Sequence, residues 1–129
     1  PVIMKLSPNV TDIVEIARIA RAVEKDAFLA RVYTEYERTY CMGRGKHGMI
    51  SSFAVRFAAK EAVLKAFGTG LRFGTLQDVE VINDEFGAPK VFLHGYFKDL
   101  AIQKGVKTAH ITLSHAIDYA VAYCVLEGE

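Results

Sequence analysis

The sequence predicts an α+β fold, in which a mostly antiparallel sheet packs with one long central helix. Apolar residues recur at helical spacing in the first half of the chain and at a spacing of two in much of the second half. The alternating segments come in consecutive pairs, which is typical of antiparallel hairpins. One long segment, Ser51–Phe67, is apolar on nearly every side, as expected for a buried helix.

Length and composition indicate one folded domain that spans residues 1–129. The chain has 129 residues, of which 51% are hydrophobic, and this apolar content excludes a disordered chain. No apolar run approaches the roughly 20 residues that span a bilayer, and no signal-peptide pattern is visible. A formal net charge of +1 argues against a general nucleic-acid-binding protein. We therefore expect a cytoplasmic protein with no membrane and no nucleic-acid partner.

The first elements in chain order are a strand and a helix. Val2–Leu6 has strand character, and Asn9–Ile13 extends it beyond Pro8. From Ile13 to Val23 the apolar residues recur every three or four positions, which predicts an amphipathic helix.

Two further short helices and a loop follow. Asp26–Tyr33 has a helical pattern, and Thr34 and Glu37 have the spacing of a capping box that starts a helix ending near Met42. The next segment, Gly43–Gly48, is rich in glycine and basic residues. It is predicted to be a loop that either holds an anion or is simply solvated.

The central helix comes next and leads to a hairpin. Ser51–Phe67 forms this helix, and Gly68 has the position of a C-cap, where glycine is favoured because it adopts the left-handed backbone. Asp78–Ile82 and Lys90–Leu93 alternate with a period of two. The turn-forming residues within Asn83–Pro89 join them into a predicted hairpin.

A helix and two strands complete the chain. Phe97–Lys104 is predicted to be a short helix that ends at Gly105. His110–Leu113 and Tyr119–Val125 are predicted to be strands of a second hairpin. The order of strand, helices, hairpin, helix and strands is that of an α+β domain.

The central helix carries a carboxylate among apolar side chains. On a helical projection Glu61 falls beside Phe57 and Leu64, and a buried carboxylate is costly unless a positive group compensates it. Lys65 lies one turn further along the same face. Two interpretations stay open: an ordinary ion pair at i,i+4 spacing, or a site in which Glu61 binds a metal and Lys65 contacts a phosphate.

Asp12 also has two interpretations. Asp12 and Glu15 have capping-box spacing, so the local pattern favours Asp12 as the cap of the first helix. If Asp12 instead meets Glu61 in the fold, the two carboxylates offer the oxygen ligands that Mg²⁺ prefers. Water and substrate phosphates would complete the coordination shell.

Three other motifs are interpreted as structural. Gly68–Gly70 follows its helix, whereas phosphate-binding glycine loops precede theirs, so a turn is predicted. Ser114 and His115 are neighbours in a strand and point to opposite faces, which argues against a nucleophile–base pair. Cys41 and Cys124 cannot complete a zinc site and are predicted to be reduced core residues.

Three blocks of the sequence resemble one known family. The first, from Thr11 to Ile19, reads TDIVEIARI. The second, from Arg56 to Leu71, contains the highly specific run FAAKEAVLKAFGTG. The third is Ile111–His115, followed by Tyr119–Ala122. In their order and spacing these blocks resemble the holo-[acyl-carrier-protein] synthases, the small bacterial class of 4′-phosphopantetheinyl transferases.

The resemblance implies the 4′-phosphopantetheinyl transferase fold and a reaction. Enzymes of this family transfer 4′-phosphopantetheine from coenzyme A to a serine of apo acyl carrier protein and release adenosine 3′,5′-bisphosphate, with Mg²⁺ as cofactor. The matching positions imply that Asp12 and Glu61 are the metal ligands and that Asp12, Glu61 and Lys65 are the catalytic residues. The resemblance also implies a role in fatty acid biosynthesis and a homotrimer with its sites at subunit interfaces.

Binding roles for further residues are implied in the same way. The residues expected to contact coenzyme A are Arg56, Lys60, Lys65, His115 and the basic loop with Arg44 and Lys46. Arg18 and Lys25 occupy positions where relatives dock the acidic carrier protein. We therefore expect the small net charge to hide local clusters of positive charge.

One departure from the family pattern precedes the first aspartate. Relatives have the pattern Gly-x-Gly-x-Asp, whereas this chain has Pro8 and Val10 at the glycine positions before Asp12. This change is expected to alter the backbone geometry near Asp12.

Two other function classes stay open as alternatives. One is a non-catalytic module that binds coenzyme A or a carrier protein on the same scaffold. The other is a different magnesium-dependent phosphotransferase or a nucleotide pyrophosphatase.

Overall fold

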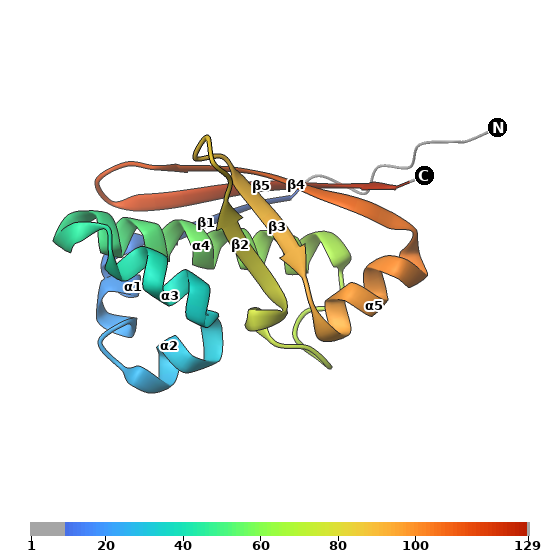
Figure 1. Ribbon diagram of the computed structural model, residues 1–129, viewed down its shortest axis with the longest axis horizontal. Helices are drawn as coiled ribbons and strands as arrows, with labels where there is room; N and C mark the ends of the chain where they lie inside the picture. The colour runs from blue at the N-terminus through green and yellow to red at the C-terminus, as the bar shows by residue number, and fades with distance from the viewer. Residues whose placement is uncertain (1–9, 129) are drawn as a thin grey trace.

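The computed structural model describes residues 10–128, so the predicted strand Val2–Leu6 and the departure at Pro8 lie outside the described residues. The elements are β1 (Val10–Glu15), α1 (Ile16–Ala22), α2 (Asp26–Val32), α3 (Glu35–Met42), α4 (Gly45–Phe67), the 3₁₀ turn η1 (Leu76–Asp78), β2 (Val79–Asn83), β3 (Pro89–Leu93), α5 (Gly95–Lys104), β4 (Val106–His115) and β5 (Tyr119–Gly128). Figure 1 shows the long helix α4 running beneath the strands. The α+β prediction is confirmed.

A three-stranded antiparallel sheet, in the order β1-β5-β4, covers one side of α4 (Figure 1). Because β5 is central, Ala122 has Asp12 of β1 as its partner on one side and Leu113 of β4 on the other. The side chains of β5 alternate, so that Ala120, Ala122, Cys124 and Leu126 are buried. Their mostly small size lets α4 pack closely on the sheet, and the core lies in this layer.

The long helix begins earlier than the sequence predicts. α4 starts at Gly45, so the prediction of a loop over Gly43–Gly48 is wrong for most of that segment. Met49 packs against the core, and this contact outweighs the low helix propensity of the glycines. The other end agrees with the prediction, since Gly68 adopts a left-handed φ of 78° and donates hydrogen bonds to the carbonyls of Leu64 and Lys65.

The first helix begins later than predicted. β1 continues through Glu15, and α1 starts at Ile16 rather than within Ile13–Val23 as a single helix. Asp12 therefore lies inside a strand, and the N-cap of α1 is Glu15, which makes no side-chain cap. The capping interpretation of Asp12 is wrong because pairing with β5 holds this backbone extended.

The remaining local predictions agree with the structure. Thr34 and Glu37 form the predicted capping box at the start of α3. The hairpins β2–β3 and β4–β5 are both antiparallel, and β2–β3 forms a separate two-stranded sheet. Cys41 and Cys124 are buried free thiols. Within residues 10–128 no helix is both long and apolar enough to cross a membrane.

Candidate functional site

Asp12, Glu61 and Lys65 lie together and are called the carboxylate site here. Asp12, on β1, accepts a hydrogen bond from Lys65 of α4, with 2.7 Å between Oδ1 and Nζ. Glu61 lies one turn before Lys65 on the same helix, and the negative charge of Asp12 contributes to its raised pKa. Strand β1 thus brings one carboxylate to the part of α4 that carries the other.

The surroundings of Glu61 disfavour an isolated negative charge. Burial is the main cause of its raised pKa, and Asp12 adds to the effect, whereas Lys65 and Arg18 lower the pKa. The pKa of Lys65 is raised, mainly through its hydrogen bond to Asp12. A divalent cation between the carboxylates would relieve their mutual repulsion.

The carboxylate site fits Mg²⁺ because this ion needs few protein ligands. Among residues 10–128 there is no group of three or more His, Cys, Asp or Glu side chains that could hold a metal ion. Mg²⁺ is commonly bound by one or two carboxylates, with water and substrate phosphates completing its octahedron. An open cavity of about 400 Å³ beside the carboxylates leaves room for these ligands and is lined by Glu61, Leu64, Lys65, Gly68, Gly70 and Leu71.

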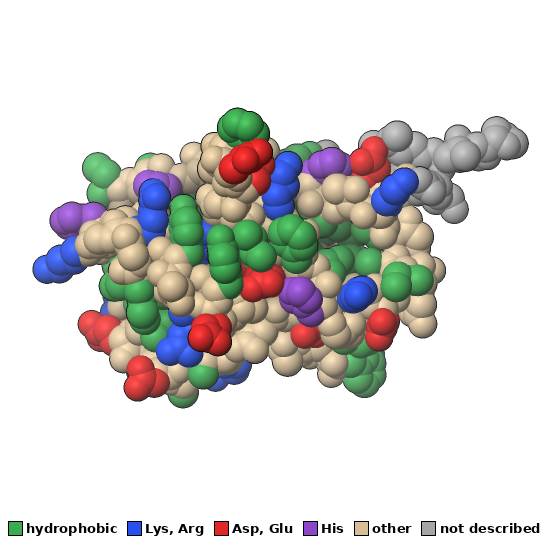
Figure 2. All heavy atoms as spheres, viewed as in Figure 1, with side chains coloured by type: hydrophobic (Ala, Val, Ile, Leu, Met, Phe, Trp, Pro, Cys, Tyr) green, Lys and Arg blue, Asp and Glu red, His purple; other side chains and the backbone are tan. Residues whose placement is uncertain are grey.

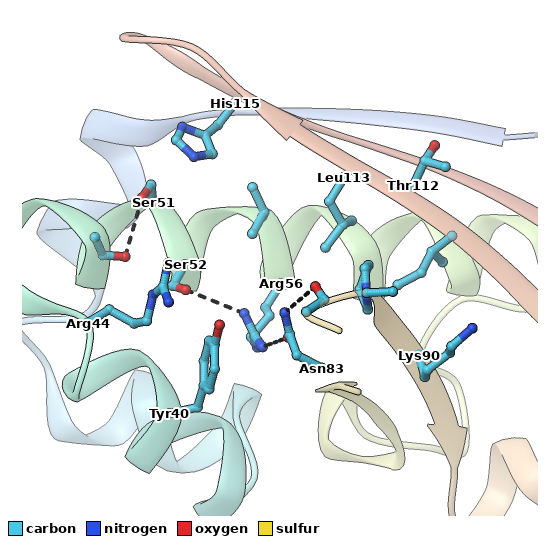
Figure 3. Close-up of a pocket in the computed structure, with 16 residues that line it drawn as sticks. Tyr40, Arg44, Ser51, Ser52, Arg56, Asn83, Lys90, Thr112, Leu113 and His115 are labelled. Carbon is cyan, nitrogen blue, oxygen red and sulfur yellow. Dashed lines mark hydrogen bonds between the residues drawn. The ribbon is translucent and has the colours of Figure 1, made fainter. Parts of the chain in front are cut away.

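A second cavity, called the basic cavity here, has a volume of about 540 Å³ and lies between α4, β4 and the turn of the first hairpin (Figure 3). The polar and charged side chains that line it are those of Tyr40, Arg44, Ser51, Ser52, Arg56, Asn83, Lys90, Thr112 and His115. No Asp or Glu is present among the described residues of this lining. The arrangement favours an anionic ligand, and guanidinium and ammonium groups are typical partners of phosphate.

Arg56 is held firmly at the wall of the basic cavity and is only 2% exposed. Its Nη2 donates to Oδ1 of Asn83 at 2.5 Å, and the ring of Tyr40 lies 4.4 Å from its Cζ (Figure 3). A longer contact of 3.5 Å joins Nη1 to the hydroxyl of Ser52. Its Nε is buried and has no hydrogen-bond partner among the described residues. The guanidinium is therefore positioned in advance and keeps unused donor capacity.

Sequence reasoning missed several residues of the basic cavity. Asn83 and Lys90 flank the turn of the first hairpin, and both line the cavity together with Tyr40. The available signal was that a hairpin turn brings its two flanks together in space. Lys46, which was expected to contact coenzyme A, lies outside this lining and borders a neighbouring cavity with Arg44 and His115.

Lys60, expected among the residues that contact coenzyme A, is a core residue instead. Its side chain is fully buried, and its Nζ lies 2.8 Å from Oε1 of Glu37. The same ammonium donates to the carbonyls of Leu76 at 3.0 Å and Val79 at 2.5 Å. All three donors of the ammonium are used inside the fold. The structure therefore contradicts the assignment of Lys60 to coenzyme A.

The carboxylate site and the basic cavity lie on different sides of α4. Arg56 and Glu61 are five residues apart, which places their side chains about 140° apart around the helix axis. Asp12 belongs to β1, whereas His115 belongs to β4, at the opposite edge of the three-stranded sheet. The described part of one chain does not join the two sites into one pocket.

The two residues expected to dock a carrier protein are both exposed. Arg18 lies on α1 and is close enough to Glu61 to lower its pKa. Lys25 lies directly before α2. A positively charged surface thus begins at the carboxylate site and continues along the first helices.

The chain is similar to known proteins over nearly its whole length. Residues 11–124 match the family model described as the 4′-phosphopantetheinyl transferase superfamily. The holo-[acyl-carrier-protein] synthase of Koribacter versatilis is 44% identical over 119 residues, which cover 90% of this chain and 94% of that protein. The enzyme of the same name from Clostridium tetani is 46% identical over 121 residues, covering 92% and 93%. A Bacillus anthracis holo-(acyl-carrier-protein) synthase solved in complex with CoA (3′,5′-ADP) superposes with a TM-score of 0.81 and 34% identity, covering 98% of this chain and 100% of that one.

Proposed function

The chain belongs to the 4′-phosphopantetheinyl transferase superfamily, and from this membership we propose how its residues carry out the holo-[acyl-carrier-protein] synthase reaction. The enzyme transfers 4′-phosphopantetheine from coenzyme A to acyl carrier protein, a step that serves fatty acid biosynthesis. The acceptor is a serine hydroxyl of the apo carrier protein, and adenosine 3′,5′-bisphosphate is released. The observation that carries the residue assignment is the meeting of Asp12, Glu61 and Lys65 at one place.

The carboxylate site is the reacting centre. The attacked phosphorus is surrounded by negative oxygens, so catalysis depends on reducing charge repulsion and on alignment. Asp12 and Glu61 hold Mg²⁺, which when bound supplies positive charge to the pyrophosphate of coenzyme A. Lys65 is 54% exposed and donates to a phosphate oxygen of the same group.

The basic cavity receives the adenosine 3′,5′-bisphosphate part of the donor. Arg56 contributes a fixed guanidinium, and Arg44, Lys90 and His115 contribute further donors around the same space. Lys46 lies outside this lining and contributes positive charge nearby. Because a phosphate accepts several hydrogen bonds at once, convergent basic side chains suit this part of coenzyme A.

A homotrimer joins the two sites at its subunit interfaces. The face of the three-stranded sheet that points away from α4 carries exposed apolar side chains, including Ile13 at 60%, Tyr119 at 49% and Tyr123 at 36% exposure. A second copy of the chain covers this face and brings its basic cavity to the carboxylate site of its neighbour. Head-to-tail contacts of this kind close into a ring of three.

The carrier protein docks through its acidic surface on Arg18 and Lys25. Both side chains are exposed, and Arg18 is close to Glu61, so a carrier bound there presents its serine near the reacting phosphate. Complementary charge mainly raises the rate of encounter, which makes this contact sensitive to salt.

Incubation of the protein with apo acyl carrier protein, coenzyme A and Mg²⁺ tests the proposal. The expected result is a carrier heavier by one phosphopantetheine group in mass spectrometry, and no increment when the metal is chelated. Tight binding of coenzyme A without transfer would instead indicate the non-catalytic binding module. Cleavage of the pyrophosphate without modification of the carrier would indicate a pyrophosphatase.

A further inference from the structure

Glu37 and Lys60 form a fully buried ion pair that none of the proposed catalytic steps uses. Both side chains are 0% exposed, and Nζ of Lys60 lies 2.8 Å from Oε1 of Glu37. Burial lowers the pKa of Lys60, and the charge of Glu37 opposes this shift. Two desolvated charges are an expensive way to fill a core, and well-packed apolar residues often do so as well or better. The pair therefore calls for a role other than stability alone.

The ion pair substitutes for a missing neighbour strand along β2. Strand β2 pairs with β3 on one side only. On its other side, the backbone N–H of Val81 donates to Oε2 of Glu37 at 2.8 Å, and the carbonyl of Val79 accepts from Lys60 at 2.5 Å. The buried edge of β2 is thus satisfied by side chains of α3 and α4 instead of by backbone.

The elements that Glu37 connects are the same ones that hold the guanidinium of Arg56. Asn83 follows Val81 by two residues, so its side chain lies on the same side of β2, and its Oδ1 accepts from Arg56. Tyr40 follows Glu37 by about one turn of α3, and its ring lies 4.4 Å from Cζ of Arg56. Glu37 also accepts from the backbone N–H of Thr34 at 2.9 Å and so anchors the start of α3.

We propose that Glu37 is a positioning residue for the basic cavity: by fixing β2 and α3 it places Asn83 and Tyr40, which in turn aim the guanidinium of Arg56 at the donor. The inference rests on the proposed function, because it takes the basic cavity to be the coenzyme A site. Loss of the pair then weakens binding of the donor more than it slows transfer at saturating donor.

The test compares binding and turnover in variants that leave no unpaired buried charge. In Glu37→Met with Lys60→Met both charges are replaced by apolar side chains of similar size. We expect the KM for coenzyme A and the Kd for adenosine 3′,5′-bisphosphate, measured by calorimetry, to rise about tenfold while kcat changes by less than about threefold. Glu37→Gln with Lys60→Met keeps an acceptor for Val81 and is expected to recover most of the affinity. Glu35→Gln, an exposed change on the same helix, serves as the matched control.

A double-mutant cycle with Asn83→Ala separates positioning from general stability. If Glu37 acts through Asn83, the effects on Kd of changing both residues are smaller than the sum of the single effects. Additive effects, an unchanged Kd in a folded Met–Met variant, or a lower kcat with unchanged KM would each overturn the inference. If the Met–Met variant does not fold, the same cycle is measured with Glu37→Gln and Lys60→Met. Failure of the unaltered protein to bind adenosine 3′,5′-bisphosphate would reject the coenzyme A site itself, and with it this inference.

Discussion

Nζ of Lys65 lies 2.7 Å from Oδ1 of Asp12, so a helix and a strand from distant parts of the chain form one ion pair beside Glu61. The side chain of Lys65 is 54% exposed, whereas that of Asp12 is 12% exposed. Lys65 is therefore free to exchange its carboxylate partner for a substrate phosphate without disturbing the core.

Lys65→Met is expected to lower kcat for carrier modification at least about tenfold, because a developing phosphate charge loses a cationic donor. Unfolding free energy is expected to change by less than about 1 kcal/mol, since exposed ion pairs contribute little. Mass spectrometry of the carrier over time and thermal unfolding measure the two quantities. An unchanged kcat at saturating coenzyme A would contradict the phosphate role.

Glu61→Gln is expected to lower Mg²⁺-dependent transfer at least about a hundredfold, because the amide removes the charge of a metal ligand while keeping its shape. The variant is expected to retain its circular dichroism spectrum and its oligomeric state. A magnesium titration of activity checks the result, and Glu24→Gln, an exposed change outside the site, is the control. Full activity of Glu61→Gln would reject the metal assignment.

Arg56→Lys is expected to raise the Kd for adenosine 3′,5′-bisphosphate by roughly 10- to 100-fold, the range expected for losing a charge-assisted hydrogen bond. A lysine has no planar fork to contact Asn83 while stacking on Tyr40. Calorimetric titration gives the Kd. Equal affinity in the variant and the unaltered protein would place the donor elsewhere.

Mixing two inactive variants tests whether the sites are shared between subunits. Arg56→Met lacks a working basic cavity and Glu61→Gln lacks a working carboxylate site, so each alone is expected to be nearly inactive. After reassembly from an equal mixture, about a quarter of the head-to-tail interfaces combine two intact halves, and activity returns accordingly. No recovery, despite mixed oligomers seen by native mass spectrometry, would show that each chain completes its own site.

Glu80 is expected to make folding stability depend on acid pH. Burial by itself raises the pKa of Glu80, but hydrogen bonds from Thr34 and His94 outweigh burial and lower it. A lowered folded-state pKa contributes stability above the unfolded value, near 4.3, that is lost as the pH falls through the folded value. Glu80→Gln is therefore expected to be less stable than the unaltered protein at pH 7, with the difference shrinking below about pH 4. Urea unfolding at several pH values measures this, and a constant difference would contradict it.

Predictions from local signals were accurate where the signal is itself local. The capping box of Thr34 and Glu37, the glycine at the end of α4 and both hairpins depend on neighbouring residues, and all are confirmed. Asp12 shows where a local signal misleads, because its capping pattern is overridden by hydrogen bonding of β1 to β5. Pairing with a strand more than a hundred residues away leaves no trace in a short window of sequence.

The sequence by itself determined the fold class, the family and the residue types that phosphoryl transfer requires, because each of these follows from periodicity or from a contiguous motif. Only the tertiary structure decided what the charged residues of α4 do. Lys60 and Lys65 occur in the same motif, yet Lys60 points inward to Glu37 and Val79, whereas Lys65 points outward to Asp12. The direction of each depends on acceptors supplied by other elements, and the distribution of such acceptors is set by packing rather than by spacing along one helix.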